Sequence, residues 1–144
     1  MVDADIFAAR IDALAHYLKR LQGFRDISRE QFVADEDRHA LAERFLHMAI
    51  EAALDLANHW ISHAGLGVPE SNAESFTALE RAKEIPADLA ERLRGWAKFR
   101  NVLVHEYVRI NHEVSYRAIQ GELGDLEALL AWAVTKLGPT PPAA

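Results

Sequence analysis

Apolar residues recur along most of the chain at alternating steps of four and three, the spacing that places them on one face of an α-helix. One such stripe lies near the amino end (Phe7, Ile11, Leu14, Leu18, Leu21) and another near the carboxyl end (Ile119, Leu123, Leu126, Leu130, Ala133, Leu137). No segment shows the period of two that β-strands require. The pattern therefore predicts an all-α fold, an antiparallel bundle of four main helices with one short extra helix.

Capping signals and turn residues set the expected helix boundaries. We expect helices over about 3–22, 35–63 and 112–137, a short helix near 75–83, and a helix opened by Pro86 that runs on past Trp96. Ser28 and Gln31 resemble a capping box that opens a short turn. The helix over 35–63 is apolar on more than one face, which predicts a central position. Residues 1–138 are then a single helical domain, followed by a flexible, proline-rich tail over 139–144.

Composition narrows the class of protein. With 144 residues, 50% of them apolar, the chain is long enough for one domain with its own core. It contains no cysteine, which excludes disulfides, thiolate metal sites and thiol redox chemistry. The start of the chain lacks the pattern of a secretory signal, and no stretch is apolar enough to cross a membrane. We therefore expect a soluble, cytoplasmic protein.

The charges are unevenly distributed along the chain. The formal net charge is −6, which argues against an extended surface for binding nucleic acid. Between Arg92 and His112, however, five basic residues stand against the single acid Glu106, a local charge of +4. This segment can form a local basic face for phosphate groups. A solvated helix surface gives the same run of charges, so the pattern alone leaves both interpretations open.

An arginine interrupts the apolar stripe of the helix that Pro86 opens. The stripe through Leu93 and Trp96 continues by helical steps to Arg100. Burial of an unpaired guanidinium is costly, so either an internal carboxylate meets Arg100 or this face opens onto a cleft or a second subunit. His105 follows five residues later, a turn of roughly 140° on a regular helix. A two-fold dimer would bring two arginines and two histidines around one groove.

The segment RNVLVHEY, residues 100–107, resembles the Arg-x-x-x-x-His-x-Tyr signature of HepT-like toxins in the HEPN superfamily. RFLHMAIEAALDLANHWIS resembles the long second helix of that family, and the similarity in pattern spans about Phe7 to Leu130. The resemblance implies a HEPN-like domain that acts as the toxin of a type VII-like toxin–antitoxin pair. It implies a metal-independent endoribonuclease without cofactor, active on RNA as a homodimer and neutralised by an MntA-type nucleotidyltransferase antitoxin.

The residue types of this motif suit RNA cleavage by the neighbouring 2′-hydroxyl. That reaction needs a base, an acid and cationic stabilisation of the phosphorane. Histidine titrates at about pH 6.5 in model peptides, so His105 can serve as base or acid. Arg100 offers a fixed fork of donors to phosphate oxygens. Asn101 orients the phosphate or supports the histidine, or is a surface polar residue near a helix end.

Tyr107 has a regulatory role by resemblance. In the HepT-like family the tyrosine of the motif accepts AMP groups from the partner nucleotidyltransferase. AMP on Tyr107 would place negative charge and bulk beside Arg100 and His105, and would exclude substrate phosphate. The alternative is a tyrosine packed at an interface with its hydroxyl in water.

Other polar residues allow different functions. Asp55, His59 and His63 fall at i, i+4 and i+8, a spacing that suggests a metal-binding bundle, but successive steps drift by roughly 40° and make one ion hard to share. Glu36-x-x-His39 is a single motif where a di-iron bundle needs two. We therefore predict no metal site.

The remaining candidate residues belong to the expected groove. Asp55 and Asn58 line its polar side or pair with Arg100, and Lys98 and Arg109 add positive charge. Trp60, Trp96 and Trp132 stack bases in an RNA path or pack in the core, and their apolar neighbours favour packing. A non-catalytic helical adaptor that binds the nucleotidyltransferase remains the alternative from a different functional class.

Overall fold

The computed structural model describes residues 3–137 and contains only helices over that range, which confirms the all-α prediction. The elements follow in the order α1 (Ala4–Gln22), α2 (Arg29–Ala34), α3 (Glu36–Ala64), α4 (Asn72–Arg81), α5 (Ala87–His105), the 3-10 helix η1 (Tyr107–Arg109), α6 (His112–Gly121) and α7 (Gly124–Lys136). None of these helices has the length and apolar character needed to span a bilayer. The expected tail over 139–144 lies outside the described residues.

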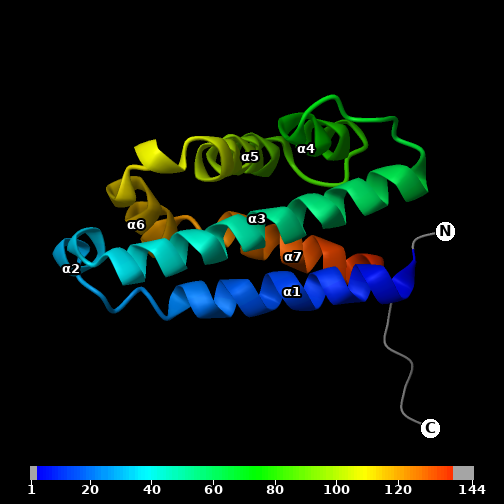
Figure 1. Ribbon diagram of the computed structural model, residues 1–144. Helices are drawn as coiled ribbons and strands as arrows, with labels where there is room; N and C mark the ends of the chain where they lie inside the picture. Colours follow the sequence, from blue (N-terminus) through cyan, green and yellow to red (C-terminus); the bar gives the residue numbers. More distant parts are fainter. Residues whose placement is uncertain (1–2, 138–144) are drawn as a thin grey trace, which may run out of the picture.

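The long helix α3 is the central element of the bundle (Figure 1). It runs antiparallel to α1 on one side and to α5 on the other, and α7 also packs against it. The short α4 packs beside α5, whereas α2 and α6 lie together at one end of the molecule. The chain therefore places the carboxyl end of α5, η1 and α6 near the amino-terminal half of α3.

The sequence of α3 explains its central position. Its buried apolar residues face more than one neighbour: Ala42, Leu46, Ala49, Ile50, Ala52, Ala53, Leu54, Leu56, Ala57 and Ile61. The Asp35 carboxylate accepts hydrogen bonds from the first backbone N–H groups of the helix, and Gly65 ends it at φ 68°. This positive φ suits glycine because an L side chain is strained there. The predicted helix over 35–63 is thus confirmed to within one residue at each end.

The last predicted helix is divided in two, which corrects the expectation of one helix over about 112–137. Glu122, at φ −120° and ψ 0°, separates α6 from α7. Gly121 and Gly124 flank the break, and glycine has low helix propensity. The apolar stripe did not reveal the break because Ile119 before it and Leu123 and Leu126 after it are all fully buried.

Two short elements also differ from the expected boundaries. The capping serine Ser28 accepts a hydrogen bond from the Gln31 backbone N–H at 3.2 Å, as predicted, but it opens the six-residue helix α2 and not a turn. Helix α4 begins before the expected Ser75, because the Ser71 hydroxyl caps it by accepting from the backbone N–H of Glu74 at 3.2 Å.

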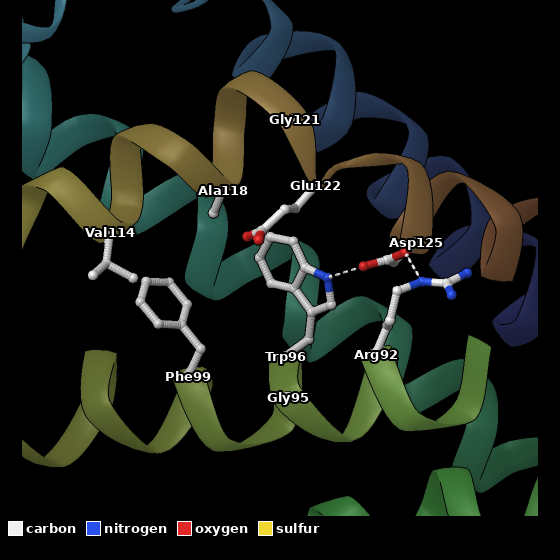
Figure 2. Close-up of a pocket in the computed structure, with 9 residues that line it drawn as sticks. All are labelled: Arg92, Gly95, Trp96, Phe99, Val114, Ala118, Gly121, Glu122 and Asp125. Carbon is white, nitrogen blue, oxygen red and sulfur yellow. Dashed lines mark hydrogen bonds and ion pairs between the residues drawn. The ribbon is translucent and has the colours of Figure 1, made fainter. Parts of the chain in front are cut away.

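Polar contacts hold α5 to α7 along one side (Figure 2). Asp125 accepts hydrogen bonds from Arg92 Nε at 2.6 Å and from Trp96 Nε1 at 3.2 Å. The hydrogen bond from Arg92 to the Asp125 carboxylate raises the pKa of Arg92 above its usual value. These contacts form one end of a cavity of about 530 Å³ whose walls include Phe99 and Val114. The helix that carries the motif is therefore fixed to α7 before its last two turns.

Candidate active site

Arg100 extends from α5 to α3, where it meets a carboxylate. Its Nε donates to Glu51 Oε1 at 2.5 Å, and its Nη1 lies 3.5 Å from Asn101 Oδ1, at the long limit of a hydrogen bond. The Arg100 side chain is 22% exposed and that of Glu51 is 33% exposed. The ion pair therefore fixes the guanidinium through one edge and leaves it in contact with solvent.

Glu51 is shared with a second side chain of α3. His47 Nε2 lies 3.3 Å from the same Glu51 oxygen, and Arg44 Nη1 lies 3.4 Å from His47 Nδ1. Together with Arg100, these residues form a continuous line of polar contacts between α3 and α5. Sequence reasoning missed Glu51 and His47. The sequence pattern that could have indicated them is a pair of polar residues four positions apart, which share one face of a helix that is otherwise apolar at its centre.

His105 is the last residue of α5. Glu106 leaves the helix at φ −126° and ψ 32°, and η1 begins directly after it. His105 and Asn101 are exposed, and within residues 3–137 no hydrogen bond engages the His105 ring. A shallow cavity of about 320 Å³ is bounded by His105 and the residues from Glu106 to Arg109. The imidazole is therefore accessible to a ligand.

Arg100 and His105 do not face each other within one chain. Helix α5 remains regular through His105, so five residues separate the two side chains by a turn of roughly 140°. Arg100 points to α3, and no hydrogen bond or ion pair joins it to His105 in the described part of the chain. A single copy thus presents the two motif residues in different directions.

The other predicted site residues divide into two groups. Tyr107, with 70% of its surface exposed, begins η1, and Arg109 ends η1 and is exposed; Lys98 is exposed on α5. These three lie on the segment that carries the motif.

Asp55 and Asn58 are engaged elsewhere. Asp55 pairs with Arg10 of α1 at 3.2 Å, and Asn58 accepts a hydrogen bond from the Ser75 hydroxyl at 2.7 Å. The carboxylate that pairs with Arg100 is therefore Glu51, one turn before Asp55. The structure does not bring Asp55 or Asn58 to the motif residues, because they face α1 and α4.

The histidines that follow Asp55 do not build a metal site with it. The His63 ring packs 5.2 Å from the Trp60 ring, measured between centroids. Over residues 3–137, no three histidine, aspartate or glutamate side chains are placed to hold one ion. Trp60 and Trp132 pack edge to face at 6.2 Å, so these tryptophans contribute to packing as the apolar neighbours suggested.

The fold and the motif define an all-helical protein that presents an arginine and a histidine near the end of one helix. The family model described as "Ribonuclease HepT-like" matches residues 14–131. The chain belongs to the HepT-like ribonuclease family, as the resemblance of the motif predicted.

Similar proteins include two curated nucleases. The chain is 31% identical to the mRNA nuclease HepT of Shewanella oneidensis, over 88% of this chain and 94% of the relative. It is 28% identical to the tRNA nuclease HepT of Aphanizomenon flos-aquae, over 82% of this chain and 80% of the relative.

Solved structures of toxin–antitoxin complexes contain chains with a similar fold. A toxin–antitoxin complex with AMP-PNP superposes with a TM-score of 0.84 at 27% identity, covering 91% of this chain and 98% of the other. A tri-AMPylated Shewanella oneidensis HEPN toxin in complex with MNT antitoxin also has a TM-score of 0.84 at 27% identity, covering 94% and 99%.

Proposed function

We propose that this protein is an RNA-cleaving toxin of the cytoplasm that acts as a homodimer without a metal ion, with Arg100 and His105 as its catalytic residues. The observation that carries the proposal is the arrangement at the end of α5. Arg100 is held by Glu51 through Nε, which leaves its Nη groups for phosphate, while His105 is exposed on a different side of the same helix.

A second copy related by a two-fold axis resolves this divergence. Such an axis brings Arg100 of one copy toward His105 of the other and creates one groove with two sets of motif residues. The guanidinium then binds the scissile phosphate and stabilises the charge of the phosphorane. The imidazole takes the proton of the attacking 2′-hydroxyl or supplies one to the leaving 5′-oxygen. Lys98 and Arg109 add positive charge along the path of the strand.

Tyr107 is the proposed site of control. Its hydroxyl lies on an exposed 3-10 turn two residues after His105, so a partner enzyme can reach it. The similar toxin from Shewanella oneidensis is AMPylated and bound to an MNT antitoxin. We infer that a nucleotidyltransferase antitoxin of the MntA type transfers AMP to Tyr107 here. The added phosphate and adenosine would repel and block the substrate phosphate.

The proposal is tested by RNA cleavage in the presence of EDTA. Wild-type protein is expected to cut RNA, and Arg100→Ala and His105→Ala are each expected to lower kcat/KM by about 100-fold or more. Arg94→Ala is the matched control, since Arg94 lies on the same helix but pairs with Glu80 of α4 at 2.9 Å. Cleavage that persists in both motif variants would exclude this site.

A non-catalytic adaptor gives a different result. Incubation with the antitoxin and ATP, followed by mass spectrometry, is expected to show AMP on Tyr107 in the wild type and none in Tyr107→Phe. An adaptor would accept AMP in the same way but would cut no RNA before modification.

A further inference from the structure

A second concave surface adjoins the motif on the side of α3. It is a groove of about 470 Å³ between the amino-terminal half of α3 and the segment from η1 to the start of α6. We call it the histidine groove because His39, His47 and His112 line it, together with Arg44 and Tyr107. Its volume lies within the range of about 300–1,000 Å³ that is usual for small-molecule sites. The catalytic residues Arg100 and His105 do not line it.

The histidine groove is connected to the catalytic arginine by direct contacts. His47 lines the groove and lies 3.3 Å from Glu51 Oε1, and that oxygen accepts from Arg100 Nε at 2.5 Å. The nucleotide adjacent to a scissile phosphate bound at Arg100 would therefore lie next to this groove. Tyr107 borders the groove from the other side, so a group attached to its hydroxyl also reaches it.

One wall of the groove offers a cation for a phosphate. Arg44 is exposed, and its one polar side-chain contact in the described part of the chain is with His47 Nδ1 at 3.4 Å. No carboxylate within residues 3–137 forms an ion pair with it. A guanidinium without a carboxylate partner is a suitable donor to phosphate oxygens.

The other wall offers flat rings for a base. The His39 and His112 rings stack with centroids 3.7 Å apart and an interplanar angle of 15°. The His39 ring nitrogen Nδ1 is bonded to the Phe32 carbonyl at 3.0 Å, which fixes the orientation of this pair. The Tyr107 ring beside them is largely exposed. Unpaired bases are commonly bound by stacking on aromatic side chains, histidine included.

The acidic residues of the groove limit the charge of its ligand. Glu43 is 6% exposed, and its Oε2 accepts from Ser115 Oγ at 2.6 Å and contacts His112 Nδ1 at 2.8 Å. One oxygen of its carboxylate is therefore already engaged within the protein. Glu36 is exposed in the first turn of α3 and also lines the groove. One cation and one free carboxylate suit a single phosphate with its base and do not suit a polyphosphate.

We propose that the histidine groove binds one nucleotide unit, with Arg44 on its phosphate and the His39–His112 stack beside its base. This inference rests on the proposed function, since the RNA nucleotide adjacent to the cleaved bond is the first source of such a unit. The second source is the nucleotide carried by a modified Tyr107. In that case modification inactivates the protein because the attached nucleotide occupies the site that the substrate needs.

The kinetic test uses substrates of two lengths with the dimeric protein. Arg44→Ala is expected to raise KM for an RNA oligonucleotide about tenfold with little change in kcat. A dinucleotide that carries only the scissile phosphate is expected to be cut equally by both proteins. Arg38→Ala is the control, because Arg38 lies on α3 outside the groove and pairs with Asp35. Equal KM values for Arg44→Ala and the wild type on the oligonucleotide would overturn the inference.

A binding test separates this inference from the proposed catalysis. The cleavage-deficient His105→Ala protein is titrated with AMP and with a 2′-deoxy oligonucleotide, and the ring signals of His39 and His112 are followed by NMR. The same signals are compared in protein with and without AMP on Tyr107. Shifts with the oligonucleotide identify the RNA source, and shifts on modification identify the attached nucleotide. Absence of shifts in every arm would overturn the inference, whereas absence of RNA cleavage by the wild type would overturn the proposed function alone.

Discussion

Arg100 forms an ion pair with Glu51 and still keeps part of its side chain exposed to solvent. The sequence allows either an internal ion pair or a face that opens onto a cleft or a second subunit, and the structure shows the ion pair. The carboxylate engages Nε only, and about a fifth of the arginine side chain, 22%, stays exposed. An ion pair of this kind orients the guanidinium before substrate arrives, which lowers the entropic cost of binding a phosphate. Glu51 is thus a positioning residue for the proposed reaction.

Replacement of Glu51 by Gln tests this role. The amide keeps the shape but weakens the hold on Arg100, so kcat is expected to fall about 10- to 100-fold with a smaller change in KM. Asp55→Asn serves as control, because Asp55 lies one turn further along α3 and pairs with Arg10. Steady-state RNA cleavage measures both variants, and circular dichroism checks the fold. Higher activity in Glu51→Gln would show instead that the carboxylate restrains the arginine.

At the scale of elements, α5 is the helix on which the site depends. It is tied to α4 by Arg94 and Glu80, to α3 by Arg100 and Glu51, and to α7 through Asp125. Contacts on three sides keep the helix regular up to its last residue. That regularity fixes the angle between Arg100 and His105 and so determines that one copy cannot bring them together.

Two glycines, one within a helix and one at a helix end, are expected to respond in opposite ways to alanine. Gly95 lies within α5, and a Cβ there would meet no atom within 4 Å, so Gly95→Ala is expected to raise stability by about 0.5–1 kcal/mol through helix propensity. Gly65→Ala is expected to lower stability by about 1 kcal/mol, because φ is 68° at that position. Urea unfolding measures both, and a gain in stability for Gly65→Ala would contradict the assigned helix end.

The contacts of Asp125 with α5 predict a loss of stability in Asp125→Ala. The nearly buried Trp96 indole loses its hydrogen-bond acceptor, at a cost of about 1 kcal/mol or more in the free energy of unfolding. The Arg92 ion pair is lost as well. The pKa of Arg92 is higher in the folded protein than in the unfolded chain. The ion pair therefore stabilises the fold at every pH below the pKa of the unfolded chain, and this stabilisation is lost only as the pH rises through the raised pKa. The part of the free energy of unfolding that comes from the Arg92 ion pair, measured by urea unfolding, should therefore be the same at pH 7 and pH 9.

At the scale of the whole molecule, the proposed catalytic groove, which is distinct from the histidine groove, forms only between two copies. Each copy supplies an arginine held by its own α3 and an exposed histidine at the end of its own α5. Under the proposed function, an oligomer is therefore part of the active site and not simply a means of adding stability.

Mixing two inactive variants tests this arrangement. Arg100→Ala and His105→Ala proteins are each expected to be inactive, but a dimer with one copy of each retains an intact arginine and an intact histidine. If the two residues act across the groove, unfolding and refolding the variants together is expected to restore part of the RNA cleavage. Each variant refolded alone is the control. No recovery, with mixed dimers verified by mass spectrometry, would contradict a site shared between copies.

The sequence by itself determined most of the helical segments, because the spacing of apolar residues is a local property that every turn of helix repeats. It also determined the motif, since Arg100 stands out in the stripe of α5 and His105 and Tyr107 follow at the spacing of the family. Which side chains meet, and where the last helix breaks, was decided only by the tertiary structure. Glu51 and not Asp55 meets Arg100, the last helix breaks at Glu122, and His39 stacks on His112 from a helix far away in the chain. These outcomes depend on how helices rotate and pack against one another, and a one-turn difference along α3 leaves the apolar pattern unchanged.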